Sequence, residues 1–325
     1  MARVLAASLS FCKLSLQEEP GDKLRAAGIQ IDVNSKGQQF TETELLSLIE
    51  GYDGIIVGAD PMTAAVINKG TNLKIIAKNG VGYDNIDLKA ATERHIYVTY
   101  TPGAVERTVA DSTFALILVL ARNIHKGDAS IRRGQWERII GSDVWHKKLG
   151  ILGLGRIGKN VVRRSKGFEM EVYACDPAAD AAFCEQNGVH LVDLETLFKT
   201  CDIVTLHAPL DETTRHIVND GTLALMKPDA LLINTSRGDL VDEQALYRAL
   251  KEKRIAGAAI DVFSKEPPPK DFPLLELANV VLTPHMAGYS RDALLFSGDM
   301  IAESIIAAFR GEVPPNVVNK ERIGQ

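Results

Sequence analysis

Short hydrophobic runs alternate with amphipathic stretches along the chain. In about the first hundred residues the hydrophobic runs predict strands at 3–8, 30–33, 54–58, 74–77 and 96–99. The helical spacing of apolar residues predicts helices between these strands, at 43–49 and 62–68. A regular succession of strand and helix is typical of a parallel sheet that is covered by helices on both faces.

The alternation begins again after residue 148 and is more regular there. We expect about six strands in this second unit, at 149–152, 171–175, 203–207, 230–234, 257–260 and 280–283. An amphipathic helix at 292–309 follows them and can return to the first unit. The fold class is therefore α/β, with two doubly wound parallel-sheet domains and a boundary near residue 100.

The stretch 104–122, which lies between the two units, contains the sequence VADSTFALILVLAR. This predicted helix is more apolar than a helix with one face in solvent should be. We expect it to pack against the sheet on one side and against a second copy of the chain on the other. The pattern therefore predicts a homodimer.

Composition narrows the class of protein. The 325 residues are 46% hydrophobic, which suits two compact cores. The formal net charge of -5 gives no basic field for nucleic acid. No uncharged apolar stretch is long enough to span a membrane, so we expect a cytoplasmic protein with no membrane partner. The four cysteines have no CxxC spacing, and no residues have metal-ligand spacing, so we expect reduced thiols and no metal.

The sequence Gly153-Leu-Gly155-Arg156-Ile157-Gly158 follows a predicted strand and opens a predicted helix. The first glycine permits a tight turn, the second lets the backbone approach a pyrophosphate, and the third lets helix and strand pack closely. The diphosphate would lie at the helix N-terminus, where free N–H groups favour anions. The motif predicts a dinucleotide site.

Asp176 ends the next predicted strand after this motif. A carboxylate at this position accepts hydrogen bonds from both hydroxyls of a ribose and repels a 2′-phosphate. Asp176 also precedes a proline and is therefore a turn residue, which is compatible with binding ribose. The residue predicts that the cofactor is NAD rather than NADP.

Polar or titratable residues follow four successive strands of the second unit. In open α/β sheets, ligands bind beyond the carboxyl ends of the strands. The residues at these ends are His207, Pro209, Thr235, Ser236, Arg237, Asp261, Glu266 and His285.

Three of these residues suit chemistry on a carboxylate substrate. The planar guanidinium of Arg237 can bind a carboxylate with two hydrogen bonds, although a surface ion pair would also explain it. Imidazole exchanges protons near neutral pH, so His285 can give or take the proton of a carbinol as hydride moves, unless its role is structural. Glu266 can orient His285 and favour its protonated form, or it can cap the proline-rich loop that follows it.

Several motifs, in the same order along the chain, resemble those of the D-isomer-specific 2-hydroxyacid dehydrogenases. They are NGVGYDNID (79–87), LGILGLGRIG, DIVTLHAPLDETTRHIV, LINTSRGDLVDEQAL, GAAIDVFSKEPP and VVLTPHMAGYS. The resemblance covers nearly the whole chain. The family includes phosphoglycerate dehydrogenases, hydroxypyruvate and glyoxylate reductases, D-lactate dehydrogenases and formate dehydrogenases.

The resemblance implies hydride transfer between NAD and the 2-carbon of a small 2-hydroxy or 2-oxo acid. It implies a catalytic triad of Arg237, Glu266 and His285. The substrate carboxylate is expected to bind across a cleft to Asn79, Gly80, Val81 and Gly82. Asp261 is expected at the nicotinamide end of the cofactor. Further cofactor-binding residues are expected to be Thr108, Arg156, Ile157, His207, Pro209, Thr213, Thr235 and Ser236.

The resemblance also implies an architecture. A Rossmann cofactor domain, here 101–287, is inserted into a flavodoxin-like substrate domain, here 1–100 with a C-terminal helix in 288–325. Hinge closure between the domains and a homodimer are implied as well. Asp111 departs from the family, since many members have Glu there. The chain ends soon after NVVNKE, so we expect no regulatory domain of the long phosphoglycerate dehydrogenases. Glu266 disfavours formate dehydrogenase, which typically has Gln there.

The same residues are compatible with two kinds of protein and with more than one substrate. An NAD(H)-sensing co-repressor would keep the same site residues, so a binding protein is an alternative to an enzyme. Lys78 precedes the substrate loop and could bind a phosphate, which slightly favours 3-phosphoglycerate over hydroxypyruvate or glyoxylate. Against this, Lys78 could be a solvated strand-end lysine, and Asp60 would repel a dianion if it faced the cleft.

Overall fold

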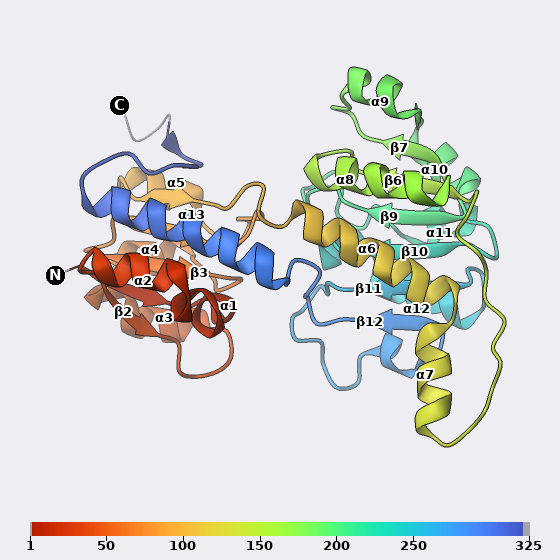
Figure 1. The fold of residues 1–325 in the computed structure, drawn as a ribbon, viewed down its shortest axis with the longest axis horizontal. Helices are drawn as coiled ribbons and strands as arrows, with labels where there is room; N and C mark the ends of the chain where they lie inside the picture. Colours follow the sequence, from red (N-terminus) through yellow and green to blue (C-terminus); the bar gives the residue numbers. More distant parts are fainter. Residues whose placement is uncertain (1, 321–325) are drawn as a thin grey trace. The chain divides into compact units, whose positions relative to one another are not determined.

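The computed structural model describes residues 2–320. It forms two compact units (Figure 1). Unit 1 contains the described chain before Glu106 and after Gly288, and unit 2 is the continuous stretch Glu106–Gly288. Unit 2 is thus inserted in sequence between two segments of unit 1.

Unit 1 is built on a parallel sheet with the order β2-β1-β3-β4-β5 within the described residues. Its strands are β1 (Arg3–Ala6), β2 (Gln30–Val33), β3 (Gly54–Val57), β4 (Ile75–Lys78) and β5 (Tyr97–Thr99). Its helices are α1 (Leu9–Lys13), α2 (Glu19–Ala26), α3 (Glu42–Leu48), α4 (Ala64–Lys69), α5 (Leu88–Glu93) and α13 (Arg291–Phe309). The interior strands β3 and β4 are buried along their whole length, as expected for a sheet covered on both faces.

The last helix, α13, belongs to unit 1, as its amphipathic pattern suggested. It packs on α2 and on β4. The ammonium of Lys23 on α2 lies 2.9 Å from the carboxylate of Asp299 on α13. Beyond α13, the side-chain oxygen of Asn319 accepts a hydrogen bond from the amide of Val98 in β5 at 3.1 Å. The C-terminal segment therefore completes unit 1.

Unit 2 is built on a second parallel sheet, whose order in the described part of the chain is β12-β11-β10-β9-β6-β7-β8. The strands are β6 (Lys148–Leu152), β7 (Glu171–Cys175), β8 (Val189–Leu191), β9 (Ile203–Leu206), β10 (Leu231–Asn234), β11 (Gly257–Ile260) and β12 (Val280–Leu282). The sequence pattern missed β8. This edge strand is three residues long and buries only Val189, so it leaves no hydrophobic run to recognise.

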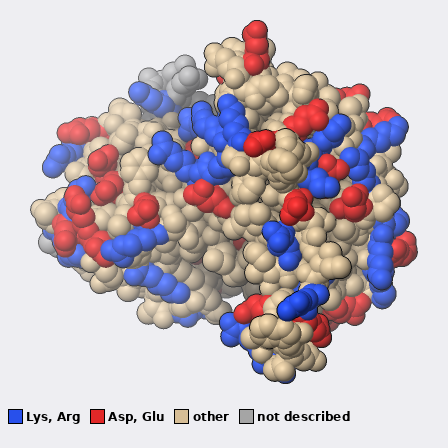
Figure 2. Space-filling model, turned by 45° about the vertical axis from the view of Figure 1, so that its right-hand side comes forward, with Lys and Arg blue, Asp and Glu red and all other residues tan. Residues whose placement is uncertain are grey.

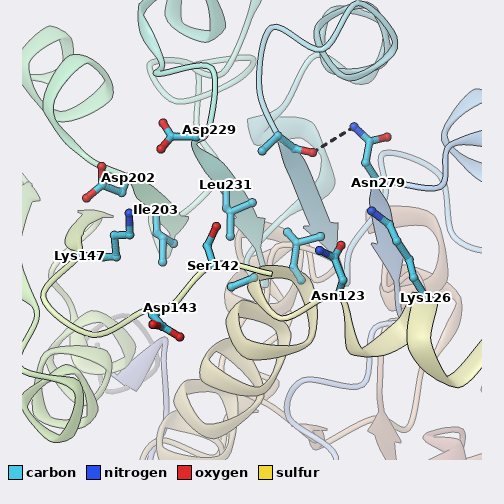
Figure 3. Close-up of a pocket in the computed structure, with 13 residues that line it drawn as sticks. Asn123, Lys126, Ser142, Asp143, Lys147, Asp202, Ile203, Asp229, Leu231 and Asn279 are labelled. Carbon is cyan, nitrogen blue, oxygen red and sulfur yellow. Dashed lines mark hydrogen bonds between the residues drawn. The ribbon is translucent and has the colours of Figure 1, made fainter. Parts of the chain in front are cut away.

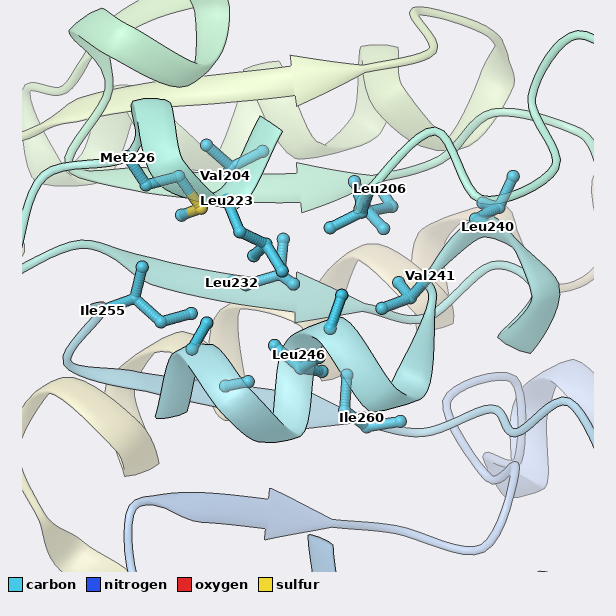
Figure 4. Packing of buried hydrophobic residues seen from close by; sticks show 14 of the residues in the cluster. Val204, Leu206, Leu223, Met226, Leu232, Leu240, Val241, Leu246, Ile255 and Ile260 are labelled. Carbon is cyan, nitrogen blue, oxygen red and sulfur yellow. The ribbon is translucent and has the colours of Figure 1, made fainter. Parts of the chain in front are cut away.

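The helices of unit 2 cover both faces of its sheet. They are α6 (Glu106–Ala121), α7 (Ile124–Arg132), α8 (Arg156–Ser165), α9 (Ala181–Asn187), α10 (Leu194–Thr200), α11 (Asp220–Leu225) and α12 (Glu243–Lys251). Strand β10 shows how the sheet separates two cores. Leu232 packs with Leu246 of α12 and Leu223 of α11 (Figure 4), whereas Leu231 and Ile233 belong to the core under α6 and α8. The alternation follows from the two-residue period of a strand.

The two strand orders identify the fold class. Numbered within each unit, the order in unit 1 is 2-1-3-4-5 and the order in unit 2 begins 3-2-1-4-5-6, which are the flavodoxin-like and Rossmann arrangements. The predicted α/β class with two doubly wound parallel sheets is confirmed. In unit 2 the order reverses between β6 and β9. Ligands of such sheets bind at this point, beyond the carboxyl ends of the strands.

The surface of the molecule carries both signs of charge. Over most of the face drawn in Figure 2, basic and acidic side chains lie close to one another. On the basic helix α8, for example, Lys159 lies 2.7 Å from Asp180 and Arg164 lies 2.5 Å from Asp111. None of the helices within residues 2–320 is both long enough and apolar enough to cross a membrane.

Candidate active site

The glycine loop after β6 needs each of its glycines for a different reason. Gly153 has φ +92°, and a Cβ there would lie 2.5 Å from the backbone nitrogen of Ala208. A Cβ on Gly158 would lie 2.3 Å from the carbonyl oxygen of Gly153, so α8 packs directly on the turn. Gly155 is exposed, and no atom lies within 4 Å of its Cβ position. The loop therefore leaves open space beside the N-terminus of α8, where a diphosphate fits.

The carboxylate of Asp176 connects this loop to the end of β7. One oxygen accepts from the amide of Leu154 at 2.6 Å and the other from the amide of Ala178 at 2.7 Å. Arg156, at the first position of α8, is exposed and lies 3.7 Å from the buried carboxylate of Glu106. Ile157 packs against the core beneath the helix. This open glycine loop with an acid at the next strand end fits a dinucleotide such as NAD.

The segment after β9 holds a neutral histidine and a tight turn. Nε2 of His207 lies 2.9 Å from the hydroxyl of Thr205, and burial lowers the pKa of His207 to about 3. The imidazole is therefore uncharged at neutral pH. After the exposed Pro209, Asp211 accepts hydrogen bonds from the amide and hydroxyl of Thr213 at 2.8 and 2.6 Å, which fixes the turn.

Asn234, at the end of β10, orders the turn that carries Arg237. Its side-chain oxygen accepts from the amide of Ser236 at 3.0 Å, and its amide group donates to the carbonyl of Arg237 at 2.8 Å. Asn234 is fully buried, and sequence reasoning missed it. The signal for it is the amide that ends the apolar run LLIN, since a buried amide requires partners.

Neighbouring side chains fix the same turn from two directions. The hydroxyl of Ser236 donates to the carbonyl of Ala208 at 2.7 Å. The hydroxyl of Thr235 lies 3.2 Å from that of Thr113 on α6. Thr108 lies one turn earlier on α6 and is half-buried.

Asp261, at the end of β11, organises the loop that carries His285. Its carboxylate accepts from the hydroxyl of Thr283 at 2.5 Å and from the amides of Met286 and Ala287 at 2.9 Å each. Its carbonyl accepts from the amide of His285 at 2.8 Å. These bonds hold His285 at φ +50°, a left-handed conformation that costs free energy in a residue other than glycine. Asp261 is 1% exposed, so these donors take the place of water around its carboxyl oxygens.

Glu266 and His285 form a directly bonded pair. Nδ1 of His285 lies 2.7 Å from one carboxylate oxygen of Glu266, and the other oxygen accepts from the amide of Phe263 at 3.1 Å. Burial alone would raise the pKa of the Glu266 carboxyl. The bond and charge of His285, the Phe263 amide and the charge of Arg237 outweigh burial and hold this pKa below its usual value.

The rest of the pair's surroundings leaves His285 able to act on a ligand. His285 is exposed, and its Nε2 has no hydrogen-bond partner among the residues that the structure describes. One nitrogen of Arg237 donates to the carbonyl of Ser236 at 2.8 Å, which steadies the guanidinium. Ionised Glu266 binds Nδ1 of His285, so the ring nitrogen that faces outward, Nε2, is suited to giving or taking a proton.

In unit 1 the predicted substrate loop follows β4. The amide of Gly80 donates to the hydroxyl of Thr101 at 3.0 Å. Within the described chain, the amides of Val81 and Gly82 have no hydrogen-bond partner. The side chain of Asn79 is bonded within unit 1, to hydroxyls of serine residues. The loop can therefore offer main-chain N–H groups to an anion.

Lys78 and Asp60 are both buried in unit 1. The ammonium of Lys78, 7% exposed, donates to the carbonyl of Gly58 at 2.5 Å and to the side chain of Asn85 at 2.9 Å. Asp60 is 2% exposed and accepts from the amides of Phe40 and Gly58 at 3.0 Å each. The carboxylate of Asp60 therefore points into unit 1.

A pocket of about 210 Å³ lies at the opposite, amino-terminal edge of the unit 2 sheet (Figure 3). Lys147 and Asp202, which line it, directly precede β6 and β9. No predicted site residue lines this pocket, so it is separate from the strand ends that carry His285. In residues 2–320 no group of three His, Cys, Asp or Glu side chains is placed to hold a metal ion.

Comparison with known proteins agrees with this geometry. Residues 114–287 match the family model of the NAD-binding domain of D-isomer-specific 2-hydroxyacid dehydrogenases. The chain is 48% identical to the glyoxylate reductase of Korarchaeum cryptofilum over 268 residues, or 81% of each protein. It is 46% identical to the D-3-phosphoglycerate dehydrogenase of Methanocaldococcus jannaschii over 290 residues, which are 88% of this chain but 55% of that enzyme.

A solved structure extends the likeness to both units. The TT0316 protein from Thermus thermophilus has a TM-score of 0.89 at 36% identity and covers 97% of this chain and 99% of its own. The family model, the relatives and the fold lead to one conclusion. The chain belongs to the D-isomer-specific 2-hydroxyacid dehydrogenases and is an NAD-dependent oxidoreductase.

Proposed function

We propose that this enzyme reduces short, unphosphorylated 2-oxo acids of the size of glyoxylate and hydroxypyruvate. The observation that carries the proposal is the set of hydrogen bonds that Lys78 makes inside unit 1. Its ammonium is engaged with Gly58 and Asn85 inside unit 1. A phosphate would have to compete with these partners for a cation that is nearly buried, at a cost in desolvation.

The loop after β3, whose Gly58 accepts a hydrogen bond from Lys78, offers no further cation. The segment after β3 reads Gly58-Ala-Asp-Pro-Met-Thr63 and contains neither lysine nor arginine. A phosphate dianion needs charge-assisted donors of its own. Glyoxylate has no phosphate and needs donors only for its carboxylate and its oxo oxygen. The similarity to a glyoxylate reductase, 48% identical over 81% of each protein, is compatible with the smaller acids.

We assign the following roles to residues of the chain. In unit 2, Arg237 is the donor for a substrate carboxylate; in unit 1, the amides of Val81 and Gly82 are donors for a group of the same kind. His285, oriented by its bond to Glu266, gives a proton from Nε2 to the 2-oxo oxygen, which becomes the hydroxyl. NADH, when bound along the glycine loop, supplies the hydride that the 2-carbon receives. Asp261 holds the loop that carries His285, so that the imidazole keeps its position during proton transfer.

The test is a panel of 2-oxo acids, with NADH oxidation followed by its absorbance. We expect kcat/KM for glyoxylate or hydroxypyruvate to exceed that for 3-phosphohydroxypyruvate by about tenfold or more. A preference for the phosphorylated acid, lost in Lys78→Ala, would overturn the proposal and assign the phosphate to Lys78. Turnover of none of these acids, with NADH still bound, would favour an NAD(H)-sensing protein.

We also propose that the enzyme is a homodimer. The segment that follows α6 exposes four large apolar side chains, with exposed fractions of 56% for Ile131, 81% for Trp136, 92% for Ile140 and 59% for Trp145. Exposed apolar residues gathered in one stretch of chain mark interaction surfaces. Light scattering during size-exclusion chromatography should give twice the chain mass of 35.4 kDa. A monomer at micromolar concentration would rule out this assembly.

A further inference from the structure

Three buried serine hydroxyls surround the side chain of Asn79. The amide nitrogen of Asn79 donates to the hydroxyls of Ser8 and Ser10, both at 3.0 Å. Its oxygen accepts from the hydroxyl of Ser297 at 2.9 Å. The serines are 2%, 7% and 1% exposed, and Ser297 comes from α13, near the other end of the sequence.

These contacts use the donors of the Asn79 amide. A carboxamide has two N–H donors, and both find a serine oxygen here. Asn79 therefore has no spare N–H for a substrate carboxylate, and its side chain acts as an anchor between β4 and α13. The next residues must supply any contact with the acid through their main chain.

Thr101 anchors the loop one residue further on. Its hydroxyl accepts from the amide of Gly80 at 3.0 Å, and its own amide donates to the carbonyl of Gly80 at 3.1 Å. Gly80 has φ +139°, where other residues are strained. With Asn79 and Gly80 fixed, the amides of Val81 and Gly82 are the first unpaired donors of the loop within residues 2–320.

We propose that Ser297 is a positioning residue for the substrate. Its hydroxyl fixes Asn79, and Asn79 sets the direction of the Val81 and Gly82 amides. This inference rests on the proposed function in one respect, namely that these two amides bind the carboxylate of the acid. Loss of the Ser297 hydroxyl leaves the half-buried Asn79 oxygen without this donor, so the loop shifts or loosens.

The test compares two serines of the same helix. Ser297→Ala should raise KM for the 2-oxo acid by about 3- to 10-fold, the effect of one hydrogen bond, with kcat and KM for NADH nearly unchanged. Ser304→Ala is the matched control. Ser304 is also 1% exposed and donates to the carbonyl of Met300 at 2.8 Å, without contact to Asn79. Equal effects of the two variants would overturn the proposal.

A double-mutant cycle separates positioning from direct contact. If Ser297 acts through Asn79, Ser297→Ala should add no further loss of kcat/KM in an Asn79→Ala background. Additive losses would mean that the two side chains act separately, which contradicts the proposal. Ser10→Ala gives a second route to the same anchor if Ser297→Ala does not fold, and it should raise the same KM.

Hydrogen exchange tests the anchor without any turnover. The amides of Gly80, Val81 and Gly82 should exchange faster in Ser297→Ala than in the wild type or in Ser304→Ala. Unchanged exchange, together with unchanged KM, would exclude the anchor and leave the proposed function standing. Faster exchange in a protein that reduces none of the 2-oxo acids would confirm the anchor and exclude the proposed function.

Discussion

Nδ1 of His285 lies 2.7 Å from a carboxylate oxygen of Glu266. The bond fixes the imidazole so that Nε2 is the nitrogen that faces outward. The bond and charge of His285 also help to hold the pKa of the Glu266 carboxyl below its usual value, against the effect of burial. The pair therefore provides a proton donor at the end of the unit 2 sheet.

Glu266→Gln should lower kcat for reduction. The amide can still accept the hydrogen bond from Nδ1, but it no longer places a negative charge 2.7 Å from the imidazole. We expect kcat to fall by about tenfold or more, since a positioned proton donor is worth about 100-fold or more. Wild-type kcat in the variant would show that Glu266 only orients His285.

The activity at acid pH follows from the pKa of Glu266, which is held below its usual value. A depressed pKa means that the ionised form persists above the folded pKa and is lost only as pH falls through it. The wild type should therefore keep the Glu266 charge at pH 5, above the usual carboxyl pKa of about 4.3. A fall in kcat/KM between pH 6 and 5 that is absent in Glu266→Gln would contradict this.

Arg237→Lys should restore only part of the activity that Arg237→Ala loses. A charge-assisted hydrogen bond is worth about 1.5–3 kcal/mol, so losing a two-bond contact with the carboxylate should lower kcat/KM by roughly 100-fold or more. Lysine keeps the charge but not the planar fork. Steady-state kinetics of both variants decide the matter, and full activity in the lysine variant would mean that charge alone suffices.

Thr283→Val should weaken catalysis without touching a reacting group. Valine keeps the shape of threonine but removes the donor that lies 2.5 Å from Asp261. We expect a loss of about tenfold or less in kcat, since the two amide donors of the loop remain, and a near-normal dissociation constant for NADH. Wild-type kcat in Thr283→Val would show that the amides of Met286 and Ala287 hold the loop unaided.

Local patterns predicted the parts of the site that depend on neighbouring residues. The glycine loop could be recognised because its glycines stand between a strand and a helix. The strand-end residues could be recognised because parallel strands bring their carboxyl ends to one edge of a sheet.

Contacts between distant parts of the chain could not be predicted in this way. The bond between Ser297 and Asn79 joins residues 218 positions apart, and nothing in the serine's own surroundings marks it. The role of Asp261 in fixing the His285 loop likewise depends on the course of a loop that sequence periodicity does not describe. Strand β8 was missed because it is only three residues long, and helix α7 was missed because Ser130 is the one buried residue in it.

Asp176 has two functions that bear on the choice of cofactor. Its carboxylate would repel a 2′-phosphate, and it also accepts hydrogen bonds from the amides of Leu154 and Ala178. Asp176→Ala removes both functions and should harm the use of NADH and NADPH alike. Asp176→Asn removes the charge but keeps one acceptor oxygen, so the ratio of kcat/KM for NADPH to that for NADH should rise by about tenfold or more. A wild type that uses NADPH as well as NADH, or an Asn variant with an unchanged ratio, would show that Asp176 fixes the glycine loop and does not select the cofactor.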